Sequence, residues 1–265
     1  MESNVTADGI SYWQYVNEFN PLYLNYICVL NSRYPIEIGN GFSYCELGCG
    51  IGVTLNGLAE LFPKGNFVGI DNNIDYIESA NILAKGVGSS NVDFSCLKYD
   101  DLSKPMLPDF DFIVINDIYS WNDENVRRNI QDFIANHLKK NGILYLNYEA
   151  LPGSASIGSL REIVSIHTNG MATDKYTKAQ SGLDYLNFLA ENNSSYFAEN
   201  VAVNQFYKVI KTKDIDYVSH RFFGESFKPF YFHQIEKEMF EIGLSFSGSA
   251  FCHLNFIDLA VSREF

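Results

Sequence analysis

The stretch YCELGCGIGVTLNGL, Tyr44–Leu58, combines an acidic residue with three closely spaced glycines. Glu46 stands just before the glycines, which are Gly48, Gly50 and Gly52. Glycine allows positive φ angles and lets a ligand approach backbone atoms that a Cβ atom would otherwise cover. A carboxylate beside such a loop disfavours a pyrophosphate and favours a cation. The stretch therefore predicts a loop that binds a nucleotide-like ligand carrying a positive charge.

The glycine spacing separates this loop from two common phosphate-binding loops. A dinucleotide fingerprint GxGxxG counted from Gly48 would need a glycine at position 53, where the chain has Val53. A P-loop would need a lysine directly before its Ser or Thr, and Thr54 has none. Dinucleotide binding and phosphate binding of the P-loop kind are therefore both disfavoured.

A second carboxylate, Asp71, ends the next apolar run of the sequence. It lies about 20 residues beyond the glycine loop, where a carboxylate can accept hydrogen bonds from both hydroxyls of a ribose. A ribose without phosphate, beside a cationic group, describes S-adenosylmethionine. We therefore predict that cofactor. The alternative, that Glu46 and Asp71 only cap turns, stays open at this point.

Alternating strands and helices are expected to position these residues. Apolar runs rich in β-branched and aromatic residues predict strands at Phe42–Gly48, Asn66–Asp71, Val92–Leu97, Asp111–Asp117 and Gly142–Tyr148. Helical patterns lie between them, the last ending at the C-cap signal Asn141-Gly142. Such alternation predicts an α/β fold with a doubly wound, mostly parallel Rossmann-like sheet and helices on both faces. Ligands bind such sheets outside the carboxyl ends of the strands, where the glycine loop falls.

The rest of the chain suggests a division into four parts. Residues 1–40 predict a helical cap, 41–153 the cofactor-binding core, 154–228 a helical insertion that serves as a substrate lobe, and 229–265 a return helix and the last strands. Strands expected within 244–251 and 256–262 would complete a seven-stranded sheet. The cap is rich in aromatic residues, which either cover a ligand or pack against the sheet: Tyr12, Trp13, Tyr15, Phe19, Tyr23 and Tyr26.

Composition restricts the classes of partner. The chain has a net charge of −13, and its Lys and Arg residues are scattered, which disfavours binding to nucleic acid or to an anionic membrane. The acidic charge either attracts basic partners or only keeps the chain soluble. Its five cysteines form no CxxC pair and no zinc-ligand pattern, so no metal site is expected. The sequence shows neither a signal peptide nor a membrane span, so we expect a cytoplasmic protein.

On these motifs the sequence resembles the class I S-adenosylmethionine-dependent methyltransferases. It is most similar to the bacterial branch related to protein-lysine methyltransferases that carry a methyltransferase regulatory domain. The resemblance covers nearly the whole chain from about Phe19, and an additional C-terminal domain is expected to be absent. The segments that carry it are FSYCELGCGIGVTLNGLAELFPKGNFVGIDNN, DFIVINDIYSW, YEALPG, YVSHRFF and GLSFSGSAF, of which IYSW and ALPG are more specific to the branch.

The resemblance implies a set of cofactor-binding residues. Residues for the methionine half would be Glu46, Gly48, Gly50 and Gly52, with Asp71 and Asn72 at the ribose and Asn116 at the amino group. Cys49, within the loop, would also contact the cofactor. Lys98 stands where an acidic residue often meets the adenine amino group. Asp100 or Asp101 would then replace that acidic residue.

The resemblance also implies residues around the transferred methyl group. Tyr119 and Trp121, with Ser120 between them, would line the substrate site, and the candidates for catalysis are Asp117, Tyr148, Glu149 and His220. The sequence departs from the branch here: Asn116-Asp117 replaces a His-Gly pair, Glu149 replaces an Asn, and His220-Arg221 replaces a His-Glu pair. Packing roles for Trp121, Tyr148 and His220 remain alternatives, and the departures affect the substrate more than the cofactor.

We therefore expect a methyltransferase that acts on a nitrogen or oxygen nucleophile. A protein lysine is favoured by the resemblance and by the acidic charge of the chain. The alternatives are a small-molecule or saccharide acceptor, or a catalytically silent cofactor-binding partner of another protein. The sequence does not predict the oligomeric state.

Overall fold

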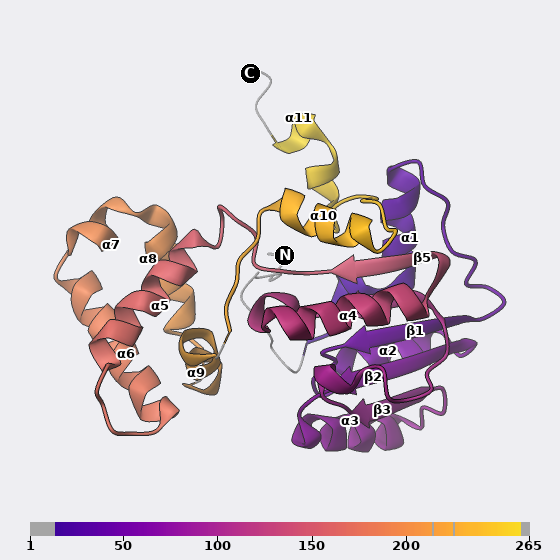
Figure 1. Cartoon of the computed structure of the whole chain (residues 1–265), viewed down its shortest axis with the longest axis horizontal. Coiled ribbons are helices and arrows are strands. Elements are labelled where there is room, and N and C mark those ends of the chain that lie inside the picture. Colours follow the sequence, from indigo (N-terminus) through magenta and orange to yellow (C-terminus); the bar gives the residue numbers. More distant parts are fainter. Residues whose placement is uncertain (1–13, 214, 225, 261–265) are drawn as a thin grey trace. The chain divides into compact units, whose positions relative to one another are not determined.

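The computed structural model describes residues 14–213, 215–224 and 226–260, so that the predicted cap residues Tyr12 and Trp13 lie outside the described part (Figure 1). The described residues form two compact units. The helical unit consists of Ser120–Asn122 and Glu149–Phe232. The sheet unit consists of residues 14–119, Asp123–Tyr148 and residues 233–260.

The sheet unit contains a parallel sheet whose strands have the order β3-β2-β1-β4-β5. The strands are β1 (Phe42–Leu47), β2 (Gly65–Asp71), β3 (Val92–Cys96), β4 (Phe110–Ile115) and β5 (Leu138–Leu146). These five elements confirm the five strands predicted before residue 150. Because β1 is central and all strands run the same way, the segments that follow β1, β2 and β4 meet at one edge.

Aromatic side chains fill one side of this sheet. Phe42, Tyr44, Phe67 and Phe112 are buried there, and the Phe42 ring lies 5.6 Å from the rings of both Phe67 and Phe112. Two helices cover this face, α1 (Pro21–Leu30) and α2 (Val53–Leu61), while α3 (Ile74–Val87) packs beside β2 and β3. Ring contacts between close aromatic groups add to the free energy gained by burying their area.

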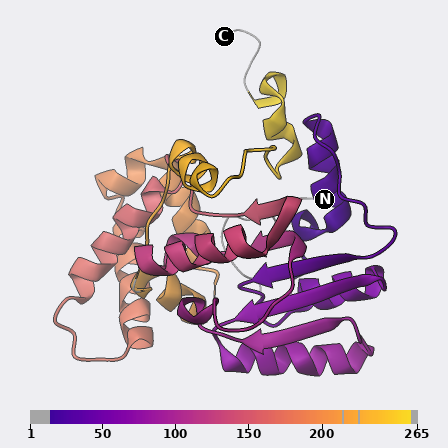
Figure 2. The same ribbon diagram turned by 45° about the vertical axis from the view of Figure 1, so that its right-hand side comes forward.

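The other face is covered by α4 (Glu124–His137), which lies in front of the sheet in Figures 1 and 2. Its buried residues Ile130, Phe133 and Ile134 face the strands, and the Phe133 ring lies 6.4 Å from that of Phe110. Helices therefore cover both faces, as an α/β sheet of parallel strands requires.

The sequence predicted that the helix before β5 continues to Asn141-Gly142, which is wrong. The helix ends at His137, and Leu138 already belongs to β5. Asn141 adopts a left-handed conformation with φ +65° at the point where the pairing of β4 with β5 changes register. Asparagine tolerates this conformation, so the C-cap signal marks an irregularity inside a strand.

The predicted total of seven strands is not confirmed, because the described residues contain five. The segment 244–251 alternates apolar residues with serines but forms no strand, and η4 (Cys252–Asn255) and α11 (Ile257–Ala260) follow it. The Asn255 side chain accepts a hydrogen bond from the Ser249 N–H and donates one to the Ser249 carbonyl, both at 2.8 Å. It thereby binds backbone groups that a sheet ladder would need.

The helical unit has a hydrophobic core of its own. Its helices are α5 (Ala155–Thr168), α6 (Lys175–Glu191), α7 (Ser195–Glu199), α8 (Val201–Ile210) and α9 (Ile215–Phe223). Leu160, Val164, Leu186 and Val218 are fully buried in that core. At Gly182 a Cβ atom would lie 2.5 Å from the Val164 side chain, so this glycine allows α5 and α6 to pack closely. None of the described helices is long and apolar enough to cross a membrane.

Candidate active site

The glycine loop passes close to the end of β4. Gly48 has φ +80°, and a Cβ atom there would lie 2.5 Å from the carbonyl oxygen of Asn116. The N–H groups of Gly48 and Cys49 both donate to the Ile70 carbonyl at the end of β2, at 2.8 and 3.2 Å. The loop is thus fixed against both neighbouring strands, and any side chain at position 48 would force it away from β4.

Asp71 fastens this loop with its carboxylate. Oδ2 accepts a hydrogen bond from the Gly50 N–H and Oδ1 accepts one from the Asn73 N–H, each at 2.9 Å. Burial raises the pKa of Asp71, and these backbone donors partly oppose the increase. Each carboxylate oxygen can accept a further hydrogen bond, so Asp71 can hold the loop and a pair of ribose hydroxyls together.

Glu46 is the most deeply buried acidic group of the site. Its exposed fraction is 2%, and its Oε2 atom has no hydrogen-bond partner among the residues that the structure describes. Burial, reinforced by the nearby charge of Asp71, raises the pKa of Glu46 to about 8, although a hydrogen bond with Asn116 opposes the increase. An unpartnered buried carboxylate is costly, and a cation bound beside it would lower that cost.

These residues fit S-adenosylmethionine. The cofactor carries positive charge and a ribose without phosphate, and the site offers an unpartnered carboxylate oxygen and a carboxylate at the end of β2. Cys49, between them, is buried, and the pKa of its thiol is raised well above its usual value, first by burial and then by Glu46 and Asp71. A thiol in that state stays protonated and adds no further charge to the loop.

Three polar residues join the ends of β4 and β5. The Asp117 N–H donates to Oδ1 of Asn147 at 2.6 Å, and the Asn147 amide donates to Oδ1 of Asn116 at 3.2 Å. Asp117 has φ +50°, a left-handed conformation that costs a non-glycine residue of order 1–3 kcal/mol and is found where the surrounding structure holds it. Sequence reasoning missed Asn147, although a polar residue directly after a buried strand was a usable signal.

The end of β3 provides the expected substitutes for an adenine contact. Asp100 and Asp101 lie on η2 (Tyr99–Asp101), where Asp100 accepts a hydrogen bond from Asn129 at 3.1 Å and Asp101 pairs with Lys104 at 2.7 Å. Tyr99 is buried, and the pKa of its hydroxyl is raised first by burial and then by the charge of Asp71. Sequence reasoning missed Tyr99 as a neighbour of Asp71. The roles of Asp100, Asp101 and the exposed Asn72 remain predictions.

Tyr119 follows β4 but is enclosed within the sheet unit. It is fully buried, and its hydroxyl donates to Glu238 at 2.5 Å and accepts from Gln131 at 2.6 Å. Glu238 belongs to α10 (Phe232–Glu241), so Tyr119 connects the end of β4 to that helix. The predicted role of Tyr119 in lining a substrate remains a prediction, and its hydroxyl is already bonded.

In the helical unit Glu149 forms a buried ion pair. Its Oε1 accepts a hydrogen bond from Arg221 Nη1 at 2.5 Å, and Arg221 Nε donates to the Tyr217 hydroxyl at 2.9 Å. The exposed fractions of Glu149 and Arg221 are 8% and 1%. The Glu149 N–H also donates to the Ser120 hydroxyl at 2.9 Å. These contacts orient Glu149 towards Arg221.

The Trp121 ring lies close to two guanidinium groups of the helical unit. Arg221 lies 4.8 Å and Arg161 5.4 Å from the ring centre, with the His220 and Phe227 rings at 5.2 and 4.8 Å. Arg161 also donates to the carbonyls of Arg221 and Gly224, at the end of α9. Burial and the charge of Arg221 lower the pKa of Arg161 to about 10. Cation–π contacts of Trp121 are thus already made within the chain.

The structure brings together Glu46, Cys49, Gly50, Asp71 and Asn116 at one edge of the sheet unit. Tyr148 belongs to the same unit and is half-buried, and burial raises the pKa of its hydroxyl. Trp121, Glu149 and His220 belong to the helical unit. The chemical roles of all these residues remain predictions.

The buried Glu46 predicts how stability depends on pH. Its folded pKa of about 8 lies above its ordinary value of 4.5, so between these values the folded chain holds a proton that the unfolded chain has lost. Stability should therefore fall as pH rises through this window, by up to about 1.4 kcal/mol per pH unit. When the free energy of unfolding is measured in urea at pH 5.5 and at pH 7.5, it should decrease less between the two values for Glu46→Gln than for the unaltered chain.

Glu78→Gln is the matched control, because Glu78 is exposed on α3. It should follow the pH dependence of the unaltered chain. A Glu46→Gln variant whose stability falls with pH as steeply as that of the unaltered chain would contradict the prediction.

The ion pair of Glu149 predicts a large loss on truncation. Glu149→Ala leaves the charge of Arg221 buried without this carboxylate, which should lower the free energy of unfolding by about 3–5 kcal/mol. Glu124→Ala, which breaks the exposed pair with Arg128, should cost less than about 1 kcal/mol. Urea unfolding of both variants under the same conditions measures the difference. Equal losses would show that the buried pair is not the source of the stability.

Comparison with known proteins places the site in a family. The sequence pattern of the methyltransferase domain matches residues 38–214, more than half of the chain. An uncharacterized protein of Synechocystis is 31% identical over 236 residues, which are 89% of this chain and 47% of that protein. The malonyl-[acyl-carrier protein] O-methyltransferase of Bacillus anthracis is 33% identical over 148 residues, covering 54% of this chain and 50% of that enzyme.

Among solved structures, PKMT2 from Rickettsia typhi in complex with AdoHcy is similar, with a TM-score of 0.74 and 29% identity. The match covers 89% of this chain and 45% of that protein. The chain thus spans about half the length of PKMT2 and of the Synechocystis relative. The glycine loop, Glu46 and Asp71 lie inside the matched methyltransferase domain. The chain belongs to the methyltransferase-domain family, whose Rossmann-like members use S-adenosylmethionine.

Proposed function

We propose that this chain transfers a methyl group from S-adenosylmethionine to a nitrogen or oxygen nucleophile, and that a protein lysine is the acceptor. The observation that carries the cofactor part is Glu46, which is buried with an unpartnered oxygen beside Asp71 and the glycine loop. The membership of the methyltransferase-domain family supports the reaction class.

Bound S-adenosylmethionine supplies a methyl group made electrophilic by a positively charged sulfur. The chain's own residues then have to bind the two reactants, orient them in line and exclude water, because an in-line displacement at carbon needs little covalent chemistry from the protein. In this proposal Glu46 faces positive charge, Asp71 accepts hydrogen bonds from the ribose, and the N–H groups of the glycine loop fix the distance between the two carboxylates.

An amine acceptor must reach the site without its proton. A lysine has an ordinary pKa of about 10.4, so a nearby group must accept a proton or the site must favour the neutral amine. We assign the proton acceptor to Asp117, whose backbone is held by Asn147 at the end of β4. The raised pKa of Tyr148 keeps its hydroxyl protonated at neutral pH, and the carboxylate of Glu149 is bonded to Arg221.

The acceptor is proposed from likeness and charge. PKMT2 is similar over 89% of this chain, and the segments IYSW and ALPG resemble the protein-lysine methyltransferase branch. The net charge of −13 attracts basic proteins over distances of about a Debye length, ~8 Å at physiological salt. In this proposal residues 154–228 serve as the substrate lobe. An oxygen acceptor is the second candidate, because a match covering 54% of the chain is an O-methyltransferase.

Calorimetric titration with S-adenosylhomocysteine tests the cofactor site. We expect micromolar binding by the unaltered chain and at least about tenfold weaker binding by Asp71→Ala, a loss of about 1.4 kcal/mol, because the variant loses both ribose contacts and the bond to Gly50. The control is Asp75→Ala, which removes an exposed carboxylate from the first turn of α3 and should leave binding unchanged. Absence of binding by the folded, unaltered chain would overturn the cofactor assignment and favour a silent partner.

The acceptor is tested with labelled S-adenosylmethionine and a mixture of basic proteins. Methylated lysine survives acid hydrolysis and is identified by amino-acid analysis, whereas a methyl ester of a carboxylate is released by mild base. Label in methylated lysine supports the proposed acceptor. Base-labile label in its place would move the assignment to an oxygen nucleophile, and the absence of label from every protein in the mixture would count against a basic protein as the acceptor.

A further inference from the structure

Glu18 is a second acidic residue of the sheet unit, after Glu46, with an oxygen that lacks a partner. It belongs to η1 (Asn17–Phe19) and is partly buried. Its Oε2 atom is buried and has no hydrogen-bond partner among the residues that the structure describes. A buried carboxylate oxygen without a hydrogen bond costs free energy unless a ligand supplies the contact. Because Glu18 is only partly buried, a ligand can reach its carboxylate from solvent.

The segment that carries Glu18 is fixed next to the glycine loop and the central strand. The Val16 N–H donates to Oγ1 of Thr54 at 3.1 Å, and Thr54 lies in the first turn of α2, directly after the loop. The Tyr44 hydroxyl of β1 donates to the Phe19 carbonyl at 3.0 Å. The backbone is thus held on both sides of Glu18, on the face of the sheet that α1 and α2 cover.

Two tyrosines lie near the Glu18 carboxylate. The pKa of the Tyr145 hydroxyl is raised first by burial and then by the charge of Glu18, and the same two causes raise the pKa of Tyr23. The Tyr145 ring also contacts the ring of Phe19, the residue after Glu18, with 5.0 Å between the ring centres. Aromatic rings beside a carboxylate suit an organic cation, because the rings attract positive charge and pack against its carbon atoms.

The strand register relates this carboxylate to Glu46. Glu46 pairs with Val114 of β4, and Val114 pairs with Tyr145 of β5, so these three residues form one row across the sheet. Val114 and Tyr145 belong to the core under α1 and α2, and Glu46, in the same row, points to that face as well. Two strand spacings separate Glu46 from Tyr145, which is about 10 Å. One face therefore carries two acidic residues with unpartnered oxygens, one at the cofactor site and one beside β5.

The next row of the same face leads to the proposed proton acceptor. Asn116 and Asn147 lie two residues beyond Val114 and Tyr145, and a hydrogen bond of 3.2 Å joins their side chains. Asn147 also accepts a hydrogen bond from the Asp117 N–H. An amine bound beside Tyr145 would therefore lie next to the strand ends that hold Asp117.

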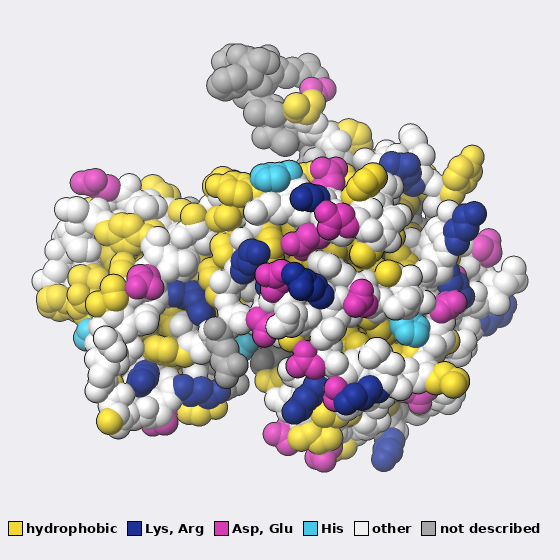
Figure 3. Space-filling model, in the orientation of Figure 1, with side chains coloured by type: hydrophobic (Ala, Val, Ile, Leu, Met, Phe, Trp, Pro, Cys, Tyr) yellow, Lys and Arg dark blue, Asp and Glu magenta, His cyan; other side chains and the backbone are white. Residues whose placement is uncertain are grey.

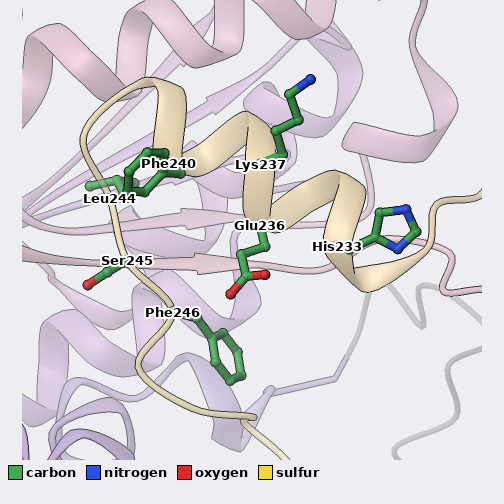
Figure 4. Close-up of a pocket in the computed structure, with 7 residues that line it drawn as sticks. All are labelled: His233, Glu236, Lys237, Phe240, Leu244, Ser245 and Phe246. Carbon is green, nitrogen blue, oxygen red and sulfur yellow. The ribbon is translucent and has the colours of Figure 1, made fainter.

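Other parts of the sheet unit fit a cation less well. On the face drawn in Figure 3, acidic side chains stand beside Lys and Arg, which partly neutralise their charge. A hollow of about 320 Å³ beside α10 is lined by both Glu236 and Lys237 (Figure 4). The described residues contain no group of three His, Cys, Asp or Glu side chains that could hold a metal ion, which leaves an organic cation as the ligand that suits Glu18.

We propose that Glu18 binds the ammonium group of the methyl acceptor, at a second cation site on the face of the sheet that carries Glu46. This inference rests on the proposed function and adds a residue to its acceptor site. Glu46 then faces the positive charge of the cofactor and Glu18 that of the arriving lysine, while Asp117 remains the proton acceptor. The rings of Tyr145 and Tyr23 pack against the carbon chain of that lysine.

Calorimetry with a small amine tests this site without requiring methyl transfer. The probe is Nα-acetyl-lysine methylamide, which carries one ammonium group, titrated into the chain saturated with S-adenosylhomocysteine. Glu18→Gln should bind it at least about tenfold more weakly than the unaltered chain, which is about 1.4 kcal/mol, because the new amide carries no charge. Glu78→Gln, the same change on exposed α3, should bind it as the unaltered chain does. A probe that the unaltered chain does not bind, or that Glu18→Gln binds equally well, overturns the proposal.

Titration with S-adenosylhomocysteine alone separates the acceptor from the cofactor, which also carries an ammonium group. The affinity of Glu18→Gln for this ligand should equal that of the unaltered chain, and a tenfold loss would overturn the proposal by assigning Glu18 to the cofactor. In urea, Glu18→Gln should be at least as stable as the unaltered chain, because the replaced oxygen has no partner among the described residues. A less stable variant would instead give Glu18 a structural role.

The two proposals can fail separately. If the unaltered chain does not bind S-adenosylhomocysteine, the proposed function fails and this inference fails with it. If the chain binds S-adenosylhomocysteine but prefers the lysine probe no more than Nα-acetyl-norleucine methylamide, which lacks the ammonium group, only this inference fails.

Discussion

The burial of the Glu46 carboxylate at the end of the central strand is the constraint on which the site depends. A carboxylate with 2% exposure and an unpartnered oxygen is destabilising by itself, and it persists only because β1 is paired on both sides and packed on both faces. Moving Glu46 outward would require the central strand to shift against β2 and β4. The sheet thus holds a buried carboxyl group, whose pKa is raised to about 8, at the position where a positively charged ligand would favour its ionised form.

The remaining site residues maintain the position of that carboxylate. Asp71 holds the glycine loop through the Gly50 N–H, and Gly48 allows the loop to lie against the Asn116 carbonyl. Asn147 then links the ends of β4 and β5, so that Asp117 follows the loop with a fixed backbone. Because each contact joins a different pair of strand ends, displacement of one strand would disturb the whole edge. Rigidity of this kind is what positioning two reacting groups requires.

The sequence predicted the parts that depend on local pattern. Apolar runs and a glycine loop flanked by Glu46 and Asp71 were sufficient for β1 to β5 and for the cofactor, because strand burial and loop geometry follow from neighbouring residues. Contacts between distant segments were not predictable in this way. The pairing of Glu149 with Arg221 joins residues 72 positions apart, and Asn255 binds Ser249 in a segment whose alternation predicted a strand. In both cases the hydrogen-bond partner of a side chain is set by the folded structure, and the pattern of neighbouring residues does not specify it.

The distribution of charge between the two parts of the chain bears on acceptor choice. Residues 149–232 contain eight Lys and Arg and nine Asp and Glu, so nearly all of the net charge of −13 lies outside this segment. Long-range attraction of a basic acceptor would therefore come from the acidic sheet unit that also holds Glu46 and Asp71. Within the helical unit, Trp121 already contacts two guanidinium groups, and a third cation at that ring would meet repulsion. If residues 154–228 serve as the substrate lobe, as proposed, selectivity there would have to come from shape and hydrogen bonding, because the overall charge of the helical unit is close to neutral.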